Sequence, residues 1–259
     1  MKTQMLMAVS ALALAAGCFK DQAAPRELPT AGSLEELASA SNRAEIARVL
    51  LRGGEGEIAP GAFAGMPSLK VLDISERKLQ EVPAAVEGLE GLEHLYMARN
   101  ALTAVPDFVF RLPSLTYLNL DGNAISSLPE SLGEAKRLRW LRLNGNALEK
   151  LPRSLAGLAS LQRIYLDGNK FKEVPEELKE MRFLEDVSME GNEVSEIPGW
   201  IGRLPSVKNL SFAGCPVRKL PDDLSGWENL STITLSGSGI VKSEVERMRA
   251  AMPKTSILF

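Results

Sequence analysis

The chain has 259 residues, of which 45% are hydrophobic, and its 30 basic and 33 acidic side chains give a formal net charge of −3. This composition is typical of a folded protein, and it provides no concentrated basic surface of the kind that nucleic-acid binding needs. Two cysteines and one histidine leave little for metal chemistry, and the patterns CxxC, HExxH, GxSxG and GxxxxGK are absent. We therefore expect a protein that is not an enzyme and has no metal, cofactor or nucleic-acid partner.

The first 17 residues have the order of a secretory signal peptide, with Lys2 followed by an apolar stretch from residue 5 to residue 16. As a helix, that stretch is too short for the ~30 Å hydrocarbon core of a membrane. It ends in Ala15-Ala16-Gly17-Cys18, which resembles the bacterial lipoprotein signal. The resemblance implies cleavage before Cys18 and lipidation of its thiol. An ordinary secretory signal followed by a chance cysteine is the alternative.

Residues 18–32 are polar and contain two prolines, which predicts a flexible tether between a lipidated Cys18 and the folded part. No aspartate stands beside Cys18, a pattern that resembles outer-membrane sorting signals. The resemblance implies a protein anchored by lipid to a bacterial outer membrane, either periplasmic or exposed on the surface. Lipidation would leave Cys215 without a disulfide partner, and we expect it to be a buried structural thiol.

Both ends of the folded part carry signals for caps. Ser33-Leu-Glu-Glu36 has the capping-box pattern, so residues 33–45 are expected to form an amino-terminal cap with a short helix over 34–40. Residues 46–68 read as a divergent first repeat that is either a strand or a helix, and we favour the strand. Residues 243–259 are expected to form a carboxy-terminal cap, with a helix that stops at Pro253 and a last strand over 257–259.

A 23-residue period dominates the chain from residue 46 to residue 242, which holds about nine repeats. Eight clear copies start at Leu69, Leu92, Leu115, Leu138, Leu161, Leu184, Val207 and Leu230. In all of them the residues at offsets 0, 3, 5 and 10 from the start are apolar, and in seven a proline stands at offset 14. Offsets 3 and 5 alternate with more polar neighbours, which predicts a short strand in each copy.

This pattern resembles the leucine-rich repeat family, LxxLxxLxLxxNxLxxLPxxL, over about three quarters of the chain. The resemblance implies an α/β solenoid with a curved parallel β-sheet on its concave face and an irregular or short-helical convex side. The offset-8 position holds an asparagine whose amide can bond backbone groups of the bend after the strand. These asparagines, which we expect to form a structural ladder, are Asn100, Asn123, Asn146, Asn169 and Asn192.

Function is expected on the outward positions of the concave strands, at offsets 2, 4 and 6. Offsets 2 and 4 hold all three tyrosines, the only histidine and one of the three tryptophans. Aromatic and arginine side chains mixed with amides and carboxylates are typical of interface hot spots. The residues predicted to bind a ligand or partner are His94, Tyr96, Tyr117, Asn119, Asp121, Trp140, Arg142, Arg163, Tyr165 and Asp167.

These residues predict a monomeric module that recognises a protein or peptide in its concave face, with the acidic offset-6 column selecting basic partners. A glycan-binding module of the same fold is the alternative, because tyrosine and tryptophan rings can stack on sugars. A third interpretation assigns no ligand to the rings and lets them pack on one another across strands.

Overall fold

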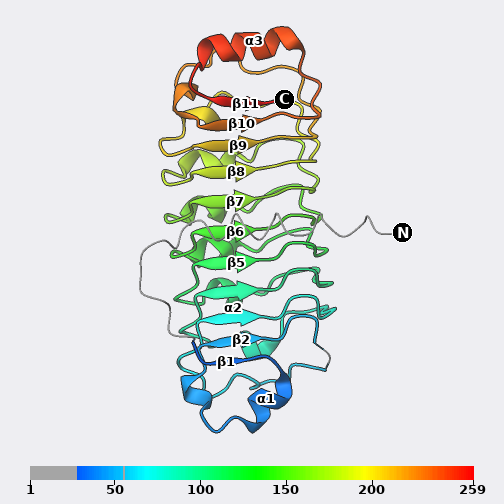
Figure 1. The fold of residues 1–259 in the computed structure, drawn as a ribbon, viewed down its shortest axis with the longest axis vertical. Helices are drawn as coiled ribbons and strands as arrows, with labels where there is room; N and C mark the ends of the chain where they lie inside the picture. The colour runs from blue at the N-terminus through cyan, green and yellow to red at the C-terminus, as the bar shows by residue number, and fades with distance from the viewer. Residues whose placement is uncertain (1–27, 55) are drawn as a thin grey trace, which may run out of the picture.

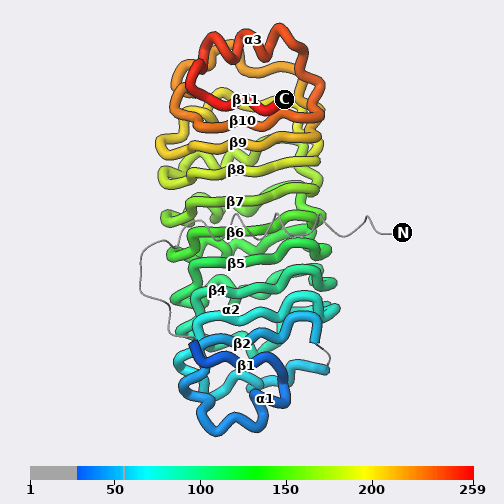
Figure 2. Tube along the Cα trace, in the orientation of Figure 1, coloured from blue at the N-terminus to red at the C-terminus, as the bar shows by residue number. Residues whose placement is uncertain are grey.

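The computed structural model describes residues 28–54 and 56–259. They form a solenoid in which every turn contributes one strand to a single parallel sheet of eleven strands, in the order β1 to β11 along the chain. Figure 1 shows the strands stacked along the long axis, with α1 at one end and α3 at the other. A chain trace in the same view shows that successive coils lie directly on one another (Figure 2). The leucine-rich-repeat solenoid expected from the period is confirmed.

The strands are three residues long except for the first, which has two. Their bounds are β1 Thr30–Ala31, β2 Arg48–Leu50, β3 Val71–Asp73, β4 His94–Tyr96, β5 Tyr117–Asn119, β6 Trp140–Arg142, β7 Arg163–Tyr165, β8 Asp186–Ser188, β9 Asn209–Ser211, β10 Thr232–Thr234 and β11 Ser256–Leu258. From β3 to β10 each strand covers offsets 2 to 4 of its repeat. The pairing is in register, so equal offsets lie side by side.

Short helical turns form the opposite, convex side. They are the α-helix α2 Asp107–Phe110 and the 3₁₀ helices η2 Ala84–Val86, η3 Glu130–Glu134, η4 Arg153–Gly157, η5 Glu176–Glu180, η6 Ile201–Arg203 and η7 Trp227–Asn229. Proline precedes η2, α2, η3, η4 and η5 directly, where its missing N–H costs no hydrogen bond. The short-helical convex side is therefore as expected.

The core lies between the sheet and these helical turns. Apolar residues at offsets 0, 3, 5 and 10 of all eight clear repeats line it, and they are buried except for the half-buried Leu79. Trp227 is fully buried and donates from Nε1 to the carbonyl oxygen of Gly199 over 2.9 Å. Because no single repeat can bury these side chains alone, stacking of the turns provides the hydrophobic stabilisation.

The amino-terminal cap consists of α1 Leu34–Ser39 and the 3₁₀ helix η1 Arg43–Glu45. Ser33 caps α1 by accepting the backbone N–H of Glu36 over 3.1 Å, as the capping-box pattern predicts. The carboxylate of Glu36 reaches back to the N–H of Gly32. Residues 48–50 of the divergent first repeat form strand β2, not a helix.

One boundary differs from the expectation. Strand β1 lies inside the segment 18–32 that the sequence suggests as a flexible tether, and it pairs with β2 in parallel. The sheet thus begins before Gly32. The sequence does not predict this strand, because two residues give too little periodic signal. The predicted signal peptide at 1–17 and the predicted lipidation site Cys18 lie outside the described residues.

The carboxy-terminal cap contains the expected helix and last strand, although the strand covers residues 256–258 instead of 257–259. Helix α3 spans Lys242–Ala251, ends before Pro253, and buries Val245 and Met248 against the last repeat. Strand β11 then closes the sheet beside β10. Among the described residues no helix combines the length and the apolarity needed to cross a membrane.

Candidate functional site

The predicted concave residues come together in one surface because their strands are paired in register. His94, Tyr117, Trp140 and Arg163 are direct neighbours on β4, β5, β6 and β7. A second row of Tyr96, Asn119, Arg142 and Tyr165 runs beside it on the same strands. All eight side chains are half-buried. We call these eight residues the aromatic patch.

Four of the five rings of the aromatic patch, those of His94, Tyr96, Tyr117 and Trp140, contact one another. Tyr117 lies at the centre, with ring centroids 5.7 Å from His94, 4.9 Å from Tyr96 and 5.6 Å from Trp140. The three contacts are tilted, with interplanar angles of 45°, 35° and 58° respectively. Neighbouring strands are ~4.8 Å apart, which brings side chains at equal offsets within ring-contact distance. The rings thus form a continuous, partly exposed apolar surface.

The two guanidinium groups of the aromatic patch lie over rings on neighbouring strands. The Cζ atom of Arg163 lies 4.6 Å from the centre of the Trp140 ring, and that of Arg142 lies 5.1 Å from the centre of the Tyr165 ring. Both distances are within the range of cation–π attraction. Each ring face covered in this way is unavailable for stacking by a ligand.

Each arginine also pairs with a carboxylate. Arg142 donates to Oδ2 of Asp121 over 2.7 Å, and Nε of Arg163 lies 2.9 Å from Oδ2 of Asp186. The first contact is an aligned hydrogen bond. The Nε–H of Arg163 has no aligned acceptor among the described residues, so the second contact is an ion pair only. Asp186 in turn accepts the side-chain amide of Asn209 over 2.6 Å. Asp186 is not among the site residues predicted from the sequence, although the repeat register places it beside Arg163.

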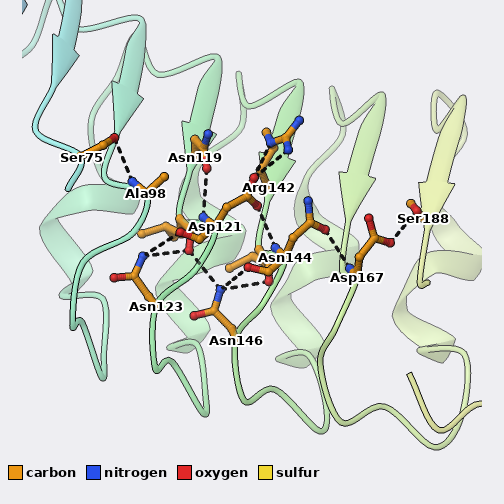
Figure 3. Close-up of polar contacts among 12 residues, drawn as sticks. Ser75, Ala98, Asn119, Asp121, Asn123, Arg142, Asn144, Asn146, Asp167 and Ser188 are labelled. Carbon is orange, nitrogen blue, oxygen red and sulfur yellow. Dashed lines mark hydrogen bonds and ion pairs between the residues drawn. The ribbon is translucent and has the colours of Figure 1, made fainter. Parts of the chain in front are cut away.

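A row of polar side chains at offset 6 borders the patch and bonds the backbone of the next repeat (Figure 3). Asp121 accepts the N–H of Asn144, Asn144 that of Asp167, and Asp167 that of Glu190, each over 2.8 Å. Ser75 accepts the N–H of Ala98 in the same way over 3.1 Å. We call Ser75, Asp121, Asn144 and Asp167 the concave-edge ladder.

The concave-edge ladder changes the role expected for Asp121 and Asp167. Both were predicted to face a ligand, and the acidic column was expected to select basic partners. Oδ1 of Asp167 also accepts the hydroxyl of Ser188 over 2.5 Å, and both oxygens of Asp121 are engaged within the sheet. These carboxylates therefore first satisfy the polar groups where each strand ends. Sequence spacing does not reveal such contacts, because they run between repeats.

The asparagines at offset 8 form a second ladder behind the first, inside the bend (Figure 3). Asn146 shows the pattern: its Nδ2 donates to the carbonyl oxygens of Leu143 and Leu120 over 3.0 Å each, and its Oδ1 accepts the N–H of Ile125 over 3.1 Å. The corresponding bonds link neighbouring repeats at Asn100, Asn123, Asn169 and Asn192. Cys215 follows them with a buried thiol that donates to the carbonyl oxygen of Met189 over 3.1 Å.

Burial shifts the pKa of several groups in the site. It lowers the pKa of His94, although nearby Glu93 opposes the shift, so the imidazole is neutral at pH 7. It raises the pKa of Tyr117 to about 12 and raises that of Asp167, for which hydrogen bonds from Ser188 and Glu190 act in the opposite direction. Burial alone disfavours the charge of Arg142, but the Asp121 carboxylate outweighs it and raises the arginine pKa.

The one histidine of the chain lies among the rings of this surface. His94 faces Tyr96 and Tyr117, at 6.5 Å and 5.7 Å between ring centroids. Among the described residues, no three histidine, cysteine or acidic side chains are grouped closely enough to hold a metal ion.

Comparisons with known proteins agree with the geometry. The family model described as "Leucine rich repeat" matches residues 56–102 and 98–148. An internalin from Listeria monocytogenes has a similar structure, with a TM-score of 0.71 and 21% sequence identity over 88% of this chain and 64% of the internalin chain. The chain thus spans less than two thirds of that protein's length. A leucine-rich-repeat protein from Leptospira interrogans has a TM-score of 0.51 and 24% identity over 83% of this chain and 72% of its own.

A search of curated protein sequences gave no significant match. The two structural similarities are at low identity and concern the fold. Together with the 23-residue period and the sheet of stacked single strands, the family match and the similar structures support a leucine-rich-repeat protein.

Proposed function

We propose that this protein is a recognition module that binds a protein or peptide partner on its concave face. The observation that carries the proposal is the aromatic patch, in which half-buried rings and two guanidinium groups form one surface on β4 to β7. Aromatic and arginine side chains at the centre of a surface supply most of the binding energy in protein interfaces. The leucine-rich-repeat fold supports protein–protein recognition in general.

The sheet itself does not require these rings. At the same offsets, β8, β9 and β10 carry Asp186, Asn209 and Thr232 in one row, and Ser188, Ser211 and Thr234 in the other. These strands pair in the same parallel register as β4 to β7. Ring packing is therefore an additional property of β4, β5 and β6. A confined patch of partly exposed large rings favours a surface in use.

The arrangement favours a peptide over a glycan. A sugar ring stacks on an open aromatic face, but Arg163 covers a face of Trp140 and Arg142 covers a face of Tyr165. Tyr117 is surrounded by three other rings. A peptide uses such a surface differently, because its side chains pack against ring edges while its polar groups bond at the rim.

We also propose that the module acts as a monomer tethered by a lipid at Cys18 to a bacterial outer membrane. The support is the sequence alone, namely the apolar leader that ends in Ala-Ala-Gly before Cys18. Incorporation of labelled palmitate into the wild type but not into Cys18→Ala, with recovery in outer-membrane fractions, tests the anchor. Label in both proteins, or in neither, contradicts it.

Binding is tested by cross-linking the full chain in envelope fractions and comparing it with the Tyr117→Ala/Trp140→Ala variant. Both proteins must first show the same circular dichroism spectrum. The proposal expects a partner that the wild type retains and the variant loses. Protease treatment of the ligand should abolish capture and periodate treatment should not. Equal capture by both proteins contradicts a concave binding site, and sensitivity to periodate alone supports the glycan interpretation.

A further inference from the structure

The carboxylate and side-chain amide groups in the aromatic patch and beside it each accept at least one hydrogen bond within the protein. Oδ1 of Asp121 accepts the backbone N–H of Asn144, and its Oδ2 accepts a hydrogen bond from Arg142. Oδ1 of Asn119 accepts the N–H of Asp121 over 2.9 Å. The other carboxylates at the outward offsets of β3 to β8 also have partners, which are Ser75 for Asp73, Ser188 for Asp167, Asn209 for Asp186 and Ser211 for Glu190.

The donors of the patch, in contrast, are in excess. Arg142 directs Nε and one terminal nitrogen at the same oxygen of Asp121, which leaves its other N–H groups available. The Nε–H of Arg163 has only the unaligned contact with Asp186 among the described residues.

The two cations are also the more exposed members of their ion pairs. The side chains of Arg142 and Arg163 are 35% and 28% exposed, whereas those of Asp121 and Asp186 are each 18% exposed. A ligand that approaches the concave face therefore meets the guanidinium groups before the carboxylates. Arginine binds carboxylates through paired N–H groups, which suits a ligand rich in acceptors.

We propose that the aromatic patch binds an acidic segment of its partner, with carboxylates on Arg142 and Arg163 and apolar side chains against Tyr117. This inference rests on the proposed function and specifies the chemistry of the partner. It reverses the expectation that the acidic column selects basic partners, because the concave-edge ladder uses that column inside the protein. It also predicts that Asp121 and Asp186 compete with the ligand for the two arginines.

This competition provides a test. The direction in which Asp186→Asn changes the affinity distinguishes acidic from basic ligands. Asp186→Asn removes the negative charge beside Arg163 and retains Oδ1 as an acceptor for Asn209. The matched control is Asp222→Asn, which removes the same charge from an exposed ion pair with Lys219 outside the strands. The probes are two fluorescent pools of random dodecapeptides, one with Asp or Glu at alternate positions and one with Lys or Arg.

Fluorescence anisotropy with the full chain then measures the affinity for each pool. The acidic pool should bind more tightly than the basic pool, and Asp186→Asn should raise its affinity about threefold or more, while Asp222→Asn changes it little. Arg163→Gln should weaken binding of the acidic pool. Each variant must retain the wild-type melting temperature.

Three results overturn the inference. They are tighter binding of the basic pool, weaker acidic binding in Asp186→Asn, and no binding of the acidic pool. If the basic pool binds and Tyr117→Ala/Trp140→Ala abolishes that binding, the result supports a concave binding site. Only the inference of an acidic partner is then wrong. If a bound pool is insensitive to Tyr117→Ala/Trp140→Ala, the proposed function fails as well.

Discussion

Oδ1 of Asn144 accepts the backbone N–H of Asp167 over 2.8 Å, which joins two repeats at the rim of the concave face. Asp167 repeats this contact toward Glu190 with a carboxylate in place of the amide. In the concave-edge ladder, either an amide or a carboxylate oxygen can therefore accept the N–H of the next repeat. The amide does so without carrying a charge. Because burial raises the pKa of Asp167, folding disfavours its charged form relative to the unfolded chain.

Asp167→Asn should consequently leave the free energy of unfolding at pH 7 unchanged or increase it. The amide oxygen keeps the bonds from Ser188 and from the N–H of Glu190 and loses the repulsion with Glu190. Asp167→Ala removes both bonds and should destabilise the fold by ~1–3 kcal/mol. Urea unfolding of both variants measures the difference, and equal losses in the two would show that the ladder bonds contribute nothing.

Asn146→Ala should destabilise the fold by ~1–3 kcal/mol, because it leaves the buried N–H of Ile125 without its acceptor. It also removes one of the two side-chain donors to the carbonyl oxygens of Leu120 and Leu143, which keep Asn123 and Asn169 respectively. Asn209→Ala is the matched control, since Asn209 is exposed and its side chain bonds only Asp186 among the described residues. The measurement is the urea midpoint of each variant. A midpoint for Asn146→Ala equal to that of the control would contradict a structural ladder.

Arg99→Gly should stabilise the fold by roughly 1 kcal/mol. Arg99 has a φ of +54° at the offset where the six following repeats have glycine, and a left-handed backbone costs an L-residue ~1–2 kcal/mol. The lost ion pair with Glu76 involves an arginine side chain that is 71% exposed, so it should offset little of the gain.

Gly145→Ala is the reverse change at an equivalent position, where φ is +61°. An added Cβ would lie 3.6 Å from the Cα of Gly122, an ordinary contact, so the expected loss of stability comes from backbone strain. Thermal unfolding of the two variants should therefore shift in opposite directions. A destabilised Arg99→Gly protein would show that the ion pair outweighs the strain.

His94 should make stability depend on pH in weakly acidic solution. Its folded pKa lies below the ordinary 6.5, so the unfolded chain binds more protons between these two values. The His94 contribution is then fully present above pH 6.5 and is lost as pH falls toward the folded pKa. Urea unfolding between pH 5 and pH 8 should show this slope in the wild type and a smaller one in His94→Gln. Equal slopes would mean that His94 titrates alike in both states.

The sequence predicts the repeats well because burial imposes the same apolar pattern in each of them. Leu118, Leu141 and Ile164 are equivalent inward residues on three successive strands, and periodicity alone locates them. The cap at Ser33 is also predictable, since its contact with Glu36 lies within one helical turn. The outward rows of the aromatic patch follow directly from the register.

The functions of individual polar groups are not predictable in this way. Whether Asp121 faces a ligand or the N–H of Asn144 depends on the distance between repeats and on a side-chain rotamer. The pairing of Arg163 with Asp186 has the same origin, because it joins residues 23 positions apart in sequence. The sequence does not predict strand β1, because its extended conformation is held by pairing with β2 and not by a local sequence pattern.

The central claim is that the aromatic patch binds a partner, and calorimetric titration of the captured partner tests it most directly. The wild type should be compared with Tyr117→Ala/Trp140→Ala and with Trp200→Ala, a half-buried tryptophan on the convex side that has its own cation contact with Lys179 at 5.5 Å. The proposal predicts a dissociation constant raised about thirtyfold or more by the first variant and unchanged by the second. Equal affinities of all three proteins would contradict the concave site.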